Sequence, residues 1–418
     1  MAQQLFFSRD TKMYLEFDGV VWELPVLDGF NFSQATNSSE ITLNEMESAG
    51  GVSRRGRRMF NDSLAPAEWS FSTYVRPFTS AGSGTEAADT AAEVHAVEEV
   101  LWAAMAGATN YANSAFDRDG NAVLTPAASN MALSFAQSNK STLGTFNIYF
   151  VLGNDNRKVY KLKDAVVGEA SIDFDIDGIA TINWSGNSSE IIDMSSNTFT
   201  QTAAPANGDG LLVGDIWLDS DAAHKLYVCT DNTASSETFS ARVSEAITDT
   251  GNFIRNRLTV LTAVPTSVDP DSDGTNELEA SYNLTLTGGN ISVSNNITFI
   301  TPEQLGLVNT PIGHVTGARS VSGSFTCYLS KDTASDDNSA DLWEDLRGIT
   351  NVVTNSFALT FKIGGSSASD TGLEVSMPTC HIDIPTHSIE DVISLETSFN
   401  ALPSTIDGTN EMSLTYRP

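Results

Sequence analysis

Apolar and small polar residues alternate along most of the chain, with the period of two that is typical of half-buried β-strands. Residues 69–75 read Trp-Ser-Phe-Ser-Thr-Tyr-Val, and residues 282–287 repeat the alternation as Tyr-Asn-Leu-Thr-Leu-Thr. Threonine, serine, valine and isoleucine dominate these runs, while glycine, asparagine and aspartate separate them. The pattern predicts a mainly β protein whose antiparallel strands turn one face to the core.

Two segments have the helical period instead. Residues 90–105 place their apolar positions on one face, begin with a Ser/Thr-x-x-Glu capping box and are followed by Gly107 as a stop. Residues 338–347 carry a second apolar stripe, followed by Gly348. We therefore expect one helix in each half of the chain.

The same order of elements recurs in the two halves. The matched segments are residues 31–33 with 290–292, 40–43 with 296–299, 69–74 with 324–328, Leu101-Trp102 with Leu342-Trp343, and 170–176 with 380–384. One further strand is predicted after each copy, at residues 179–184 and 392–399. A single match of this kind is weak, but the shared order predicts an internal duplication.

A change of composition separates the two copies. Residues 195–250 are rich in Thr, Ala, Ser, Asn and Asp, and residues 214–220 and 224–228 within them are typical of a hairpin. We therefore expect a first domain at residues 1–194, a small β-rich surface insertion at 195–250 and a second domain at 251–418.

The order of hairpin, long loop, strands, one helix and two more strands resembles the bacteriophage tail tube (major tail) protein family. Residues 30–36 and 40–45 are similar to the opening hairpin of that family, and residues 66–74 and 319–326 to its next core strand. The resemblance covers both halves but not the insertion. It implies two tandem tail-tube domains, each an antiparallel β-sandwich or barrel-like sheet with one flanking helix.

The resemblance also implies a structural role. Members of this family join their sheets into closed rings, usually of six domains, and the rings stack head to tail into a tube. Because a fused pair supplies two positions, three chains would complete a pseudo-sixfold ring. The implied partners are further copies of the chain, other tail proteins (terminator, baseplate or tip, tape measure) and DNA that passes through without specific binding. The implied location is the virion tail, after assembly in the host bacterial cytoplasm.

The 418-residue chain has a formal net charge of −31, which opposes tight binding to phosphate. Two explanations remain open: plain solubility, or a surface past which nucleic acid slides without adhering. Asp173, Asp175 and Asp177 alternate with apolar residues on one predicted strand. Their row of carboxylates is expected to face either solvent or the bore of a tube.

Arg54, Arg55, Arg57 and Arg58 form a basic run in this acidic chain. A nucleic-acid patch or a targeting signal is disfavoured, because no aromatic side chains interleave with the arginines and the overall charge is hostile to nucleic acid. In a tube subunit, a long loop reaching the carboxylates of the adjacent ring is favoured. An ordinary solvated loop is the remaining alternative.

Asp269, Asp271 and Asp273 match the opening of a calcium-binding loop. However, Ala280 occupies the position of the bidentate acid, so an acidic turn is favoured over a calcium site. The three cysteines lack the paired spacing of zinc sites and are expected to be buried. We expect no metal.

Catalytic chemistry and membrane insertion find little support. The sequence contains no paired histidines with metal spacing, no nucleophile elbow and no glycine-rich phosphate loop, so we expect neither an active site nor a cofactor. No apolar stretch approaches the ~18–20 residues that span a bilayer. The alternative function is a virion surface decoration or adhesin-type binding protein that uses residues 195–250 to hold carbohydrate or calcium.

Overall fold

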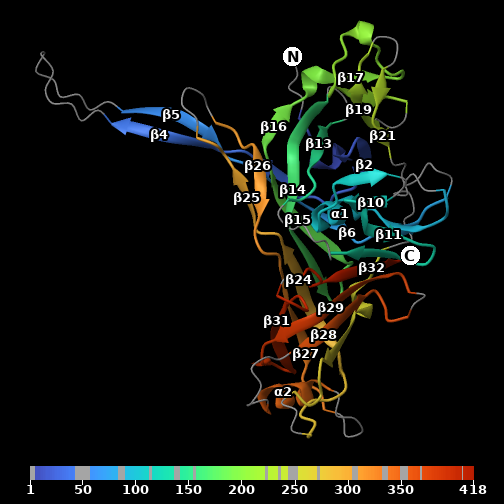
Figure 1. Cartoon of the computed structure of the whole chain (residues 1–418), viewed down its shortest axis with the longest axis vertical. Helices are drawn as coiled ribbons and strands as arrows, with labels where there is room; N and C mark the ends of the chain where they lie inside the picture. The colour runs from blue at the N-terminus through green and yellow to red at the C-terminus, as the bar shows by residue number, and fades with distance from the viewer. Residues whose placement is uncertain are drawn as a thin grey trace, which may run out of the picture.

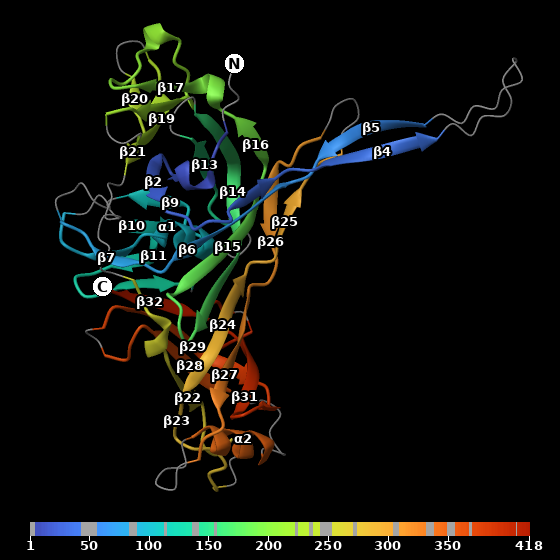
Figure 2. The ribbon, with the colours of Figure 1, turned by 180° about the vertical axis from the view of Figure 1, so that it is seen from behind.

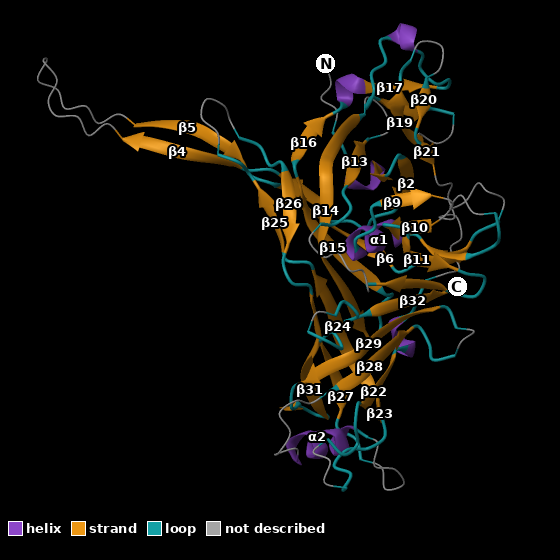
Figure 3. Cartoon of the chain, viewed as in Figure 1, coloured by secondary structure: helices purple, strands orange, loops and turns teal. Residues whose placement is uncertain are grey.

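The computed structural model confirms a mainly β protein, with large antiparallel sheets and two α-helices in the part of the chain that it describes (Figure 3). It describes residues 5–42, 57–82, 90–112, 115–135, 142–153, 157–221, 225–233, 237–242, 253–270, 274–303, 309–331, 338–348, 356–367, 370–406 and 408–418. The body is elongated, and a two-stranded ribbon projects from its side (Figure 1).

One set of antiparallel strands belongs to the first half of the chain. It comprises β1 (Thr11–Phe17), β2 (Val20–Leu24), β3 (Asn31–Ser33), β6 (Ala67–Tyr74), β13 (Phe146–Leu152), β14 (Lys158–Asp175), β15 (Thr181–Ser188) and β16 (Glu190–Asp193). Their order in the sheet is β2, β1, β13, β14, β15, β6, β3. β16 pairs beside the N-terminal part of β14.

The second half repeats this arrangement. Its strands are β22 (Val260–Pro265), β23 (Tyr282–Leu284), β24 (Leu286–Ser294), β27 (Ser320–Tyr328), β28 (Phe357–Ile363), β29 (Gly372–Ile382), β30 (Thr386–Ile389), β31 (Ile393–Ala401) and β32 (Ser413–Arg417). Their order is β23, β22, β28, β29, β31, β27, β24, and β32 pairs beside the N-terminal part of β29. The two halves therefore share one strand order.

The hydrogen-bonded register is shared as well. Phe146 faces Ala165 and Phe357 faces Cys380, and a register shift follows each of these phenylalanines. Cys380 thus holds the place of Ala165 and not of Ala170, with which the sequence comparison had matched it. That detail of the match was wrong because alternating residues define the faces of a strand, whereas the paired strand fixes its register.

The two halves meet in one continuous sheet. β14 pairs with β15 on one side and with β24 on the other, and we call the β14–β24 contact the seam. In Figure 2, β24 lies below β15, where the first half of the chain meets the second. The main hydrophobic core contains residues from both halves, so folding of one half buries apolar surface of the other.

Short strands also tie the end of the chain into the first half. They are β9 (Asn110–Ala112), β10 (Ala115–Arg118), β11 (Asn121–Pro126) and β12 (Met131–Ser134). Each pairs with the next, and β12 pairs with β32, the last strand of the chain.

The first helix is shorter than the segment predicted at residues 90–105. α1 (Glu99–Ala106) has all eight residues buried, and Gly107 ends it in the left-handed conformation at φ 98°. Before it, β8 (Val94–Ala96) pairs with β7 (Pro77–Thr79), so the predicted capping box lies outside the helix. The apolar residues Val94 and Ala96 of this segment are buried, and pairing with β7 makes it a strand.

The second helix, α2 (Ser339–Gly348), confirms the prediction at residues 338–347 to within a residue at each end. It lies at the far end of the second half and packs against β23 (Figure 1). Four of its residues are buried. α2 therefore flanks its sheet as expected, whereas α1 is enclosed in the core.

The projecting ribbon, which we call the arm, consists of β4 (Thr36–Thr42) and β5 (Arg57–Leu64) (Figure 1). A second hairpin, β25 (Ile297–Ile300) with β26 (Gly313–Thr316), lies at its root. The two meet where the Leu64 N–H donates to the Asn309 carbonyl at 2.8 Å.

Between the halves the chain builds a small sheet from β17 (Thr198–Gln201), β18 (Ile216–Asp219), β19 (Lys225–Asp231) and β20 (Thr238–Phe239). β18 and β19 confirm the predicted hairpin. The next strand, β21 (Ala241–Arg242), pairs in parallel with β2.

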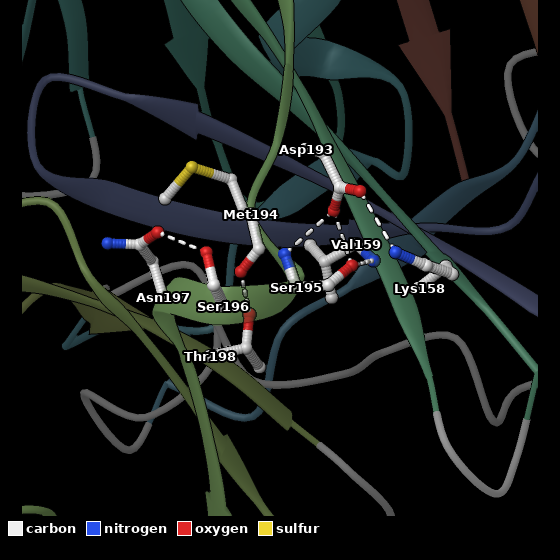
Figure 4. A network of polar contacts seen from close by, with 8 residues as sticks. All are labelled: Lys158, Val159, Asp193, Met194, Ser195, Ser196, Asn197 and Thr198. Atoms are coloured by element: carbon white, nitrogen blue, oxygen red, sulfur yellow. Dashed lines mark hydrogen bonds and ion pairs between the residues drawn. The ribbon is translucent and has the colours of Figure 1, made fainter.

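The entry into the small sheet is fixed by polar contacts around Asp193 (Figure 4). Both the N–H and the hydroxyl of Ser195 donate to this carboxylate, and Lys158 Nζ lies 2.9 Å from it. The Ser195 bonds, followed by that of Lys158, lower the pKa of Asp193 to about 2. The small sheet then packs on β1, β2, β13 and β14 through a second core of Tyr14, Val21, Tyr149, Val151, Val159, Met194, Ile216, Leu218, Leu226 and Val228.

Candidate functional site

One face of the continuous sheet is lined by small polar side chains. This polar sheet face consists of three rows across β3, β6, β15, β14, β24, β27 and β31: Asn31, Ser70, Ser185, Glu169, Ser294 and Ser320; Ser72, Asn183, Ser171, Ser292, Ser322 and Asn400; and Tyr74, Thr181, Asp173, Asn290, Ser324 and Ser398. The opposite side of the same strands carries buried apolar residues such as Trp69, Ile172 and Phe325. Each row crosses the seam without a break.

Hydrogen bonds run sideways across this face and hold Asp173 in place. The Ser72 hydroxyl donates to Asn183 Oδ1 at 2.6 Å, and Asn183 Nδ2 donates to Asp173 Oδ2 at 2.5 Å. The Ser171 hydroxyl donates to the other oxygen of Asp173 at 3.1 Å. The carboxylate is thus fixed by neutral donors and has no basic partner in these rows.

Similar contacts cross the seam and continue into the second half. The Ser292 hydroxyl of β24 donates to Glu169 of β14 at 2.9 Å, and the Ser324 hydroxyl donates to Asn290 Oδ1 at 2.8 Å. The charged groups in the three rows are Glu169 and Asp173, and the rows contain no lysine or arginine. This surface offers hydroxyls and amides but no cation that could hold a phosphate.

Two of the three aspartates predicted to form one row, Asp173 and Asp175, lie on β14. Asp173 lies on the polar sheet face, and Asp175 accepts a backbone N–H from the turn that follows β14. Asp177 lies beyond the end of the strand, 3.7 Å from Arg257. Ile176, expected in the core, is 38% exposed because β14 ends at Asp175. The predicted continuous row was therefore wrong beyond Asp175.

Two arginines of the basic run lie on the arm. Arg57 and Arg58 are in β5, and the Arg57 guanidinium is 3.3 Å from Glu40 of β4, with both side chains exposed. Arg54 and Arg55 fall outside the described residues. An exposed ion pair of this kind contributes little stability, so Arg57 remains available to another carboxylate.

The arm also exposes large apolar side chains. Ile41, Met59 and Phe60 are 53%, 69% and 47% exposed, respectively. A two-stranded ribbon is at best marginally stable alone in water. Exposed apolar side chains on such a ribbon are typical of a surface that a protein partner covers.

Asp269 contacts the backbone of its own acidic segment, and the choice between a turn and a calcium site stays a prediction. The Gly274 N–H donates to the Asp269 carboxylate at 3.0 Å, while Asp271 and Asp273 fall outside the described residues. Among the residues that can be placed, no group of three or more His, Cys, Asp or Glu side chains could hold a metal ion. The three cysteines are buried, as predicted.

None of the helices within the described ranges is long and apolar enough to cross a membrane.

Sequence reasoning did not single out most of the polar sheet face. The signal was present, since serine recurs at every second position in Ser320, Ser322 and Ser324 of β27 and in Ser292 and Ser294 of β24. Alternation shows that these residues share a face. It does not show that the face continues across β14 into the first half, because that depends on the seam.

Comparison with known proteins identifies a sequence relative of this chain. No family model matches the chain. The chain is 28% identical over 390 residues to the tail tube protein pb6 of Escherichia phage T5, an alignment that covers 93% of this chain and 69% of pb6.

Proposed function

We propose, on the premise that the chain belongs to the phage tail tube protein family, that it is a non-catalytic subunit that polymerises into stacked trimeric rings. The likeness to pb6 supports both this family and a structural role in a virion tail. Three chains, each with two tube domains, would form a pseudo-sixfold ring. The stacked rings would enclose a conduit for DNA ejection, and other tail proteins would bind at the ends of the tube.

The observation that carries this proposal is the strand order repeated in both halves. β14 pairs with β13 as β29 pairs with β28, in the same register and with the same register shift. This supports an internal duplication, with domains at residues 1–194 and 251–418 and the small sheet between them. Two equivalent units in one chain, joined edge to edge at the seam, are what a ring with six similar positions needs.

We assign the polar sheet face to the wall of the conduit. Its serine and asparagine side chains are small, so the wall is smooth, and its charged groups Glu169 and Asp173 repel phosphate. Its rows contain no lysine or arginine. DNA therefore cannot gain affinity for the wall by exchanging its counterions for protein cations. The wall is thus mostly neutral and weakly acidic, rather than lined throughout by carboxylates.

We assign the arm to the contact between stacked rings. It projects from the body beside the second hairpin and presents exposed apolar side chains together with Arg57 (Figure 1). Burial of Met59 and Phe60 against an adjacent ring would supply apolar stabilisation, and Arg57 would find carboxylates on a chain of charge −31.

Cryo-electron microscopy of the purified protein tests the proposal. We expect tubes built of rings with three chains each, and a Met59→Asp/Phe60→Asp variant that forms rings but not tubes. A matched Leu212→Asp/Val213→Asp variant, which changes exposed apolar residues of the small-sheet region, should still form tubes. A wild-type protein that gives neither rings nor tubes would refute the proposed function.

A further inference from the structure

In the part of the chain that the structure describes, two strands, β30 and β3, each have one edge without a pairing partner. Comparison with the seam shows which kind of strand each edge would pair with. β30 pairs with β31 on one side, and β3 pairs with β6 on one side. Within the described residues, no strand pairs with the other edge of either. Ile389, at the end of β30, is 79% exposed. Open edges of this kind are templates for pairing with another chain.

The register shows which seam partner each edge corresponds to. β30 holds the place of the C-terminal part of β14, because His387 faces Leu395 as Ile172 faces Ile182. Leu395 and Ile182 are themselves equivalent, since each faces the same position of the next strand, Cys327 in β27 and Thr73 in β6.

The same comparison applies to β3. Phe32 faces Trp69 of β6 as Ile291 of β24 faces Gly323 of β27. β3 therefore holds the place of β24. Inside the chain, β14 of the first half pairs with β24 of the second half. β30 holds the place of β14 in the second half and β3 holds the place of β24 in the first half, but these two strands do not pair with each other.

Resting on the proposed function, we propose that β30 of one chain pairs antiparallel with β3 of the next chain, in the register of the seam. In the seam Ile172 faces Ile291 and Asp173 faces Asn290. Carried over to the equivalent positions, this places His387 opposite Phe32, Ser388 opposite Asn31, Thr386 opposite Ser33 and Ile389 opposite Phe30.

The side chains suit this pairing on both faces. Thr386 and Ser388 would meet Ser33 and Asn31, so hydroxyl and amide groups would continue the polar sheet face from chain to chain. On the other face the exposed Ile389 would cover Phe30, which already stacks on Phe150 with ring centroids 5.2 Å apart. The contact would therefore bury apolar surface that one chain leaves in water.

The sizes of the facing residues also select the right partner. In the seam, Phe174 faces Gly289, and a Cβ at Gly289 would lie 2.9 Å from the Phe174 ring. In the proposed contact Ile389 holds the place of Phe174, and Phe30 holds the place of Gly289, so the aromatic ring is on the opposite strand. A mistaken pairing of β14 with β3 would set Phe174 against Phe30, and this crowding disfavours exchange between the two kinds of contact.

Disulfide trapping in assembled protein tests the register. We expect Ser388→Cys/Asn31→Cys to link neighbouring chains, because directly opposed residues have Cα atoms about 4.5–5.5 Å apart, within the range of a disulfide. The matched control Ser388→Cys/Ser33→Cys moves one cysteine to a diagonal position, roughly 7–8 Å away, and should link poorly. Burial raises the pKa values of Cys327 and Cys380 to about 11 and about 12, so these thiols should not compete.

Non-reducing electrophoresis separates the possible results. Covalent trimers from the matched pair alone would support both the register and the threefold ring. A ladder that continues past three chains would support the pairing but overturn the trimer. If tubes form by microscopy and the matched pair stays monomeric, or the diagonal pair links better, the proposed pairing is wrong and the proposed function stands.

Discussion

A buried hydroxyl near the end of the chain links its last strand to the first helix. Tyr416 of β32 donates to Glu98 at 2.8 Å and accepts from the Trp102 indole N–H at 2.7 Å. All three side chains are fully buried. Because Tyr416 and Glu98 lie in opposite halves of the sequence, this network joins the two halves through buried side chains.

The burial of Glu98 predicts a pH dependence of stability. Desolvation, opposed by the Tyr416 hydrogen bond, raises the pKa of Glu98 from 4.5 to about 7. Between these values the folded protein holds a proton that the unfolded chain has lost. The contribution of Glu98 to stability should therefore fall as the pH rises from 4.5 to about 7, by on the order of 3 kcal/mol, and stay level above that.

Glu98→Gln should remove this decline, because the amide is neutral throughout. Urea unfolding of the wild type and the variant across this pH range measures the difference. Glu68→Gln, which changes an exposed acid on β6, serves as the control and should keep the wild-type slope. The same slope in Glu98→Gln as in the wild type would show that Glu98 is not the group responsible.

At the scale of elements, the seam depends on a place in strand β24 where two glycines stand side by side in the sequence. Gly288 and Gly289 are adjacent on β24, facing Asp175 and Phe174 of β14. A Cβ on Gly289 would lie 2.5 Å from the Ser324 carbonyl oxygen and against the Phe174 ring, whereas a Cβ on Gly288 would make ordinary contact at 3.6 Å. The close approach is thus specific to one of the two glycines.

We expect Gly289→Ala to destabilise the monomer by roughly 1–3 kcal/mol, the cost of crowding a packed site. Gly288→Ala, the matched variant on the same strand, should stay within about 1 kcal/mol of the wild type because alanine fits there and restricts the unfolded chain. Denaturant unfolding of both proteins measures the contrast. Equal effects of the two substitutions would show that the seam does not depend on the space above Gly289.

At the scale of the whole molecule, the proposed function predicts that the charge of the polar sheet face controls how easily DNA passes through the tube. Glu169→Lys/Asp173→Lys would place cations in the wall, where they could bind passing phosphates. In phage carrying this variant we expect tails of normal length but slower DNA ejection and a lower plaque titre, with partial recovery at higher salt.

The matched control reverses two charges away from the sheet face. Asp209→Lys/Asp221→Lys changes exposed acids in and near the small sheet, so the net charge is the same and the wall is untouched. Normal ejection in this control and slow ejection in the wall variant would support the assignment. Equal ejection rates in both would place the conduit wall elsewhere.

Much of this architecture follows from the sequence. The period of two predicts a β protein, and the repeated order of elements anticipates the shared strand order of the two halves. α2 and the hairpin of β18 and β19 lie where local signals place them. These features depend on residues close together in the chain, where side-chain period and turn residues decide the structure.

Tertiary structure decided the rest, because each remaining feature depends on a distant partner. Pairing with β7 makes β8 a strand where the sequence predicts a helix, and pairing with β28 sets Cys380 opposite Phe357. The polar sheet face is continuous because β24 lies against β14. Residue type and period predict which residues of a strand share a face, because both are local properties of the chain. Which strands lie side by side was fixed by hydrogen bonding between segments far apart in the chain, and alternation within a strand does not encode that choice.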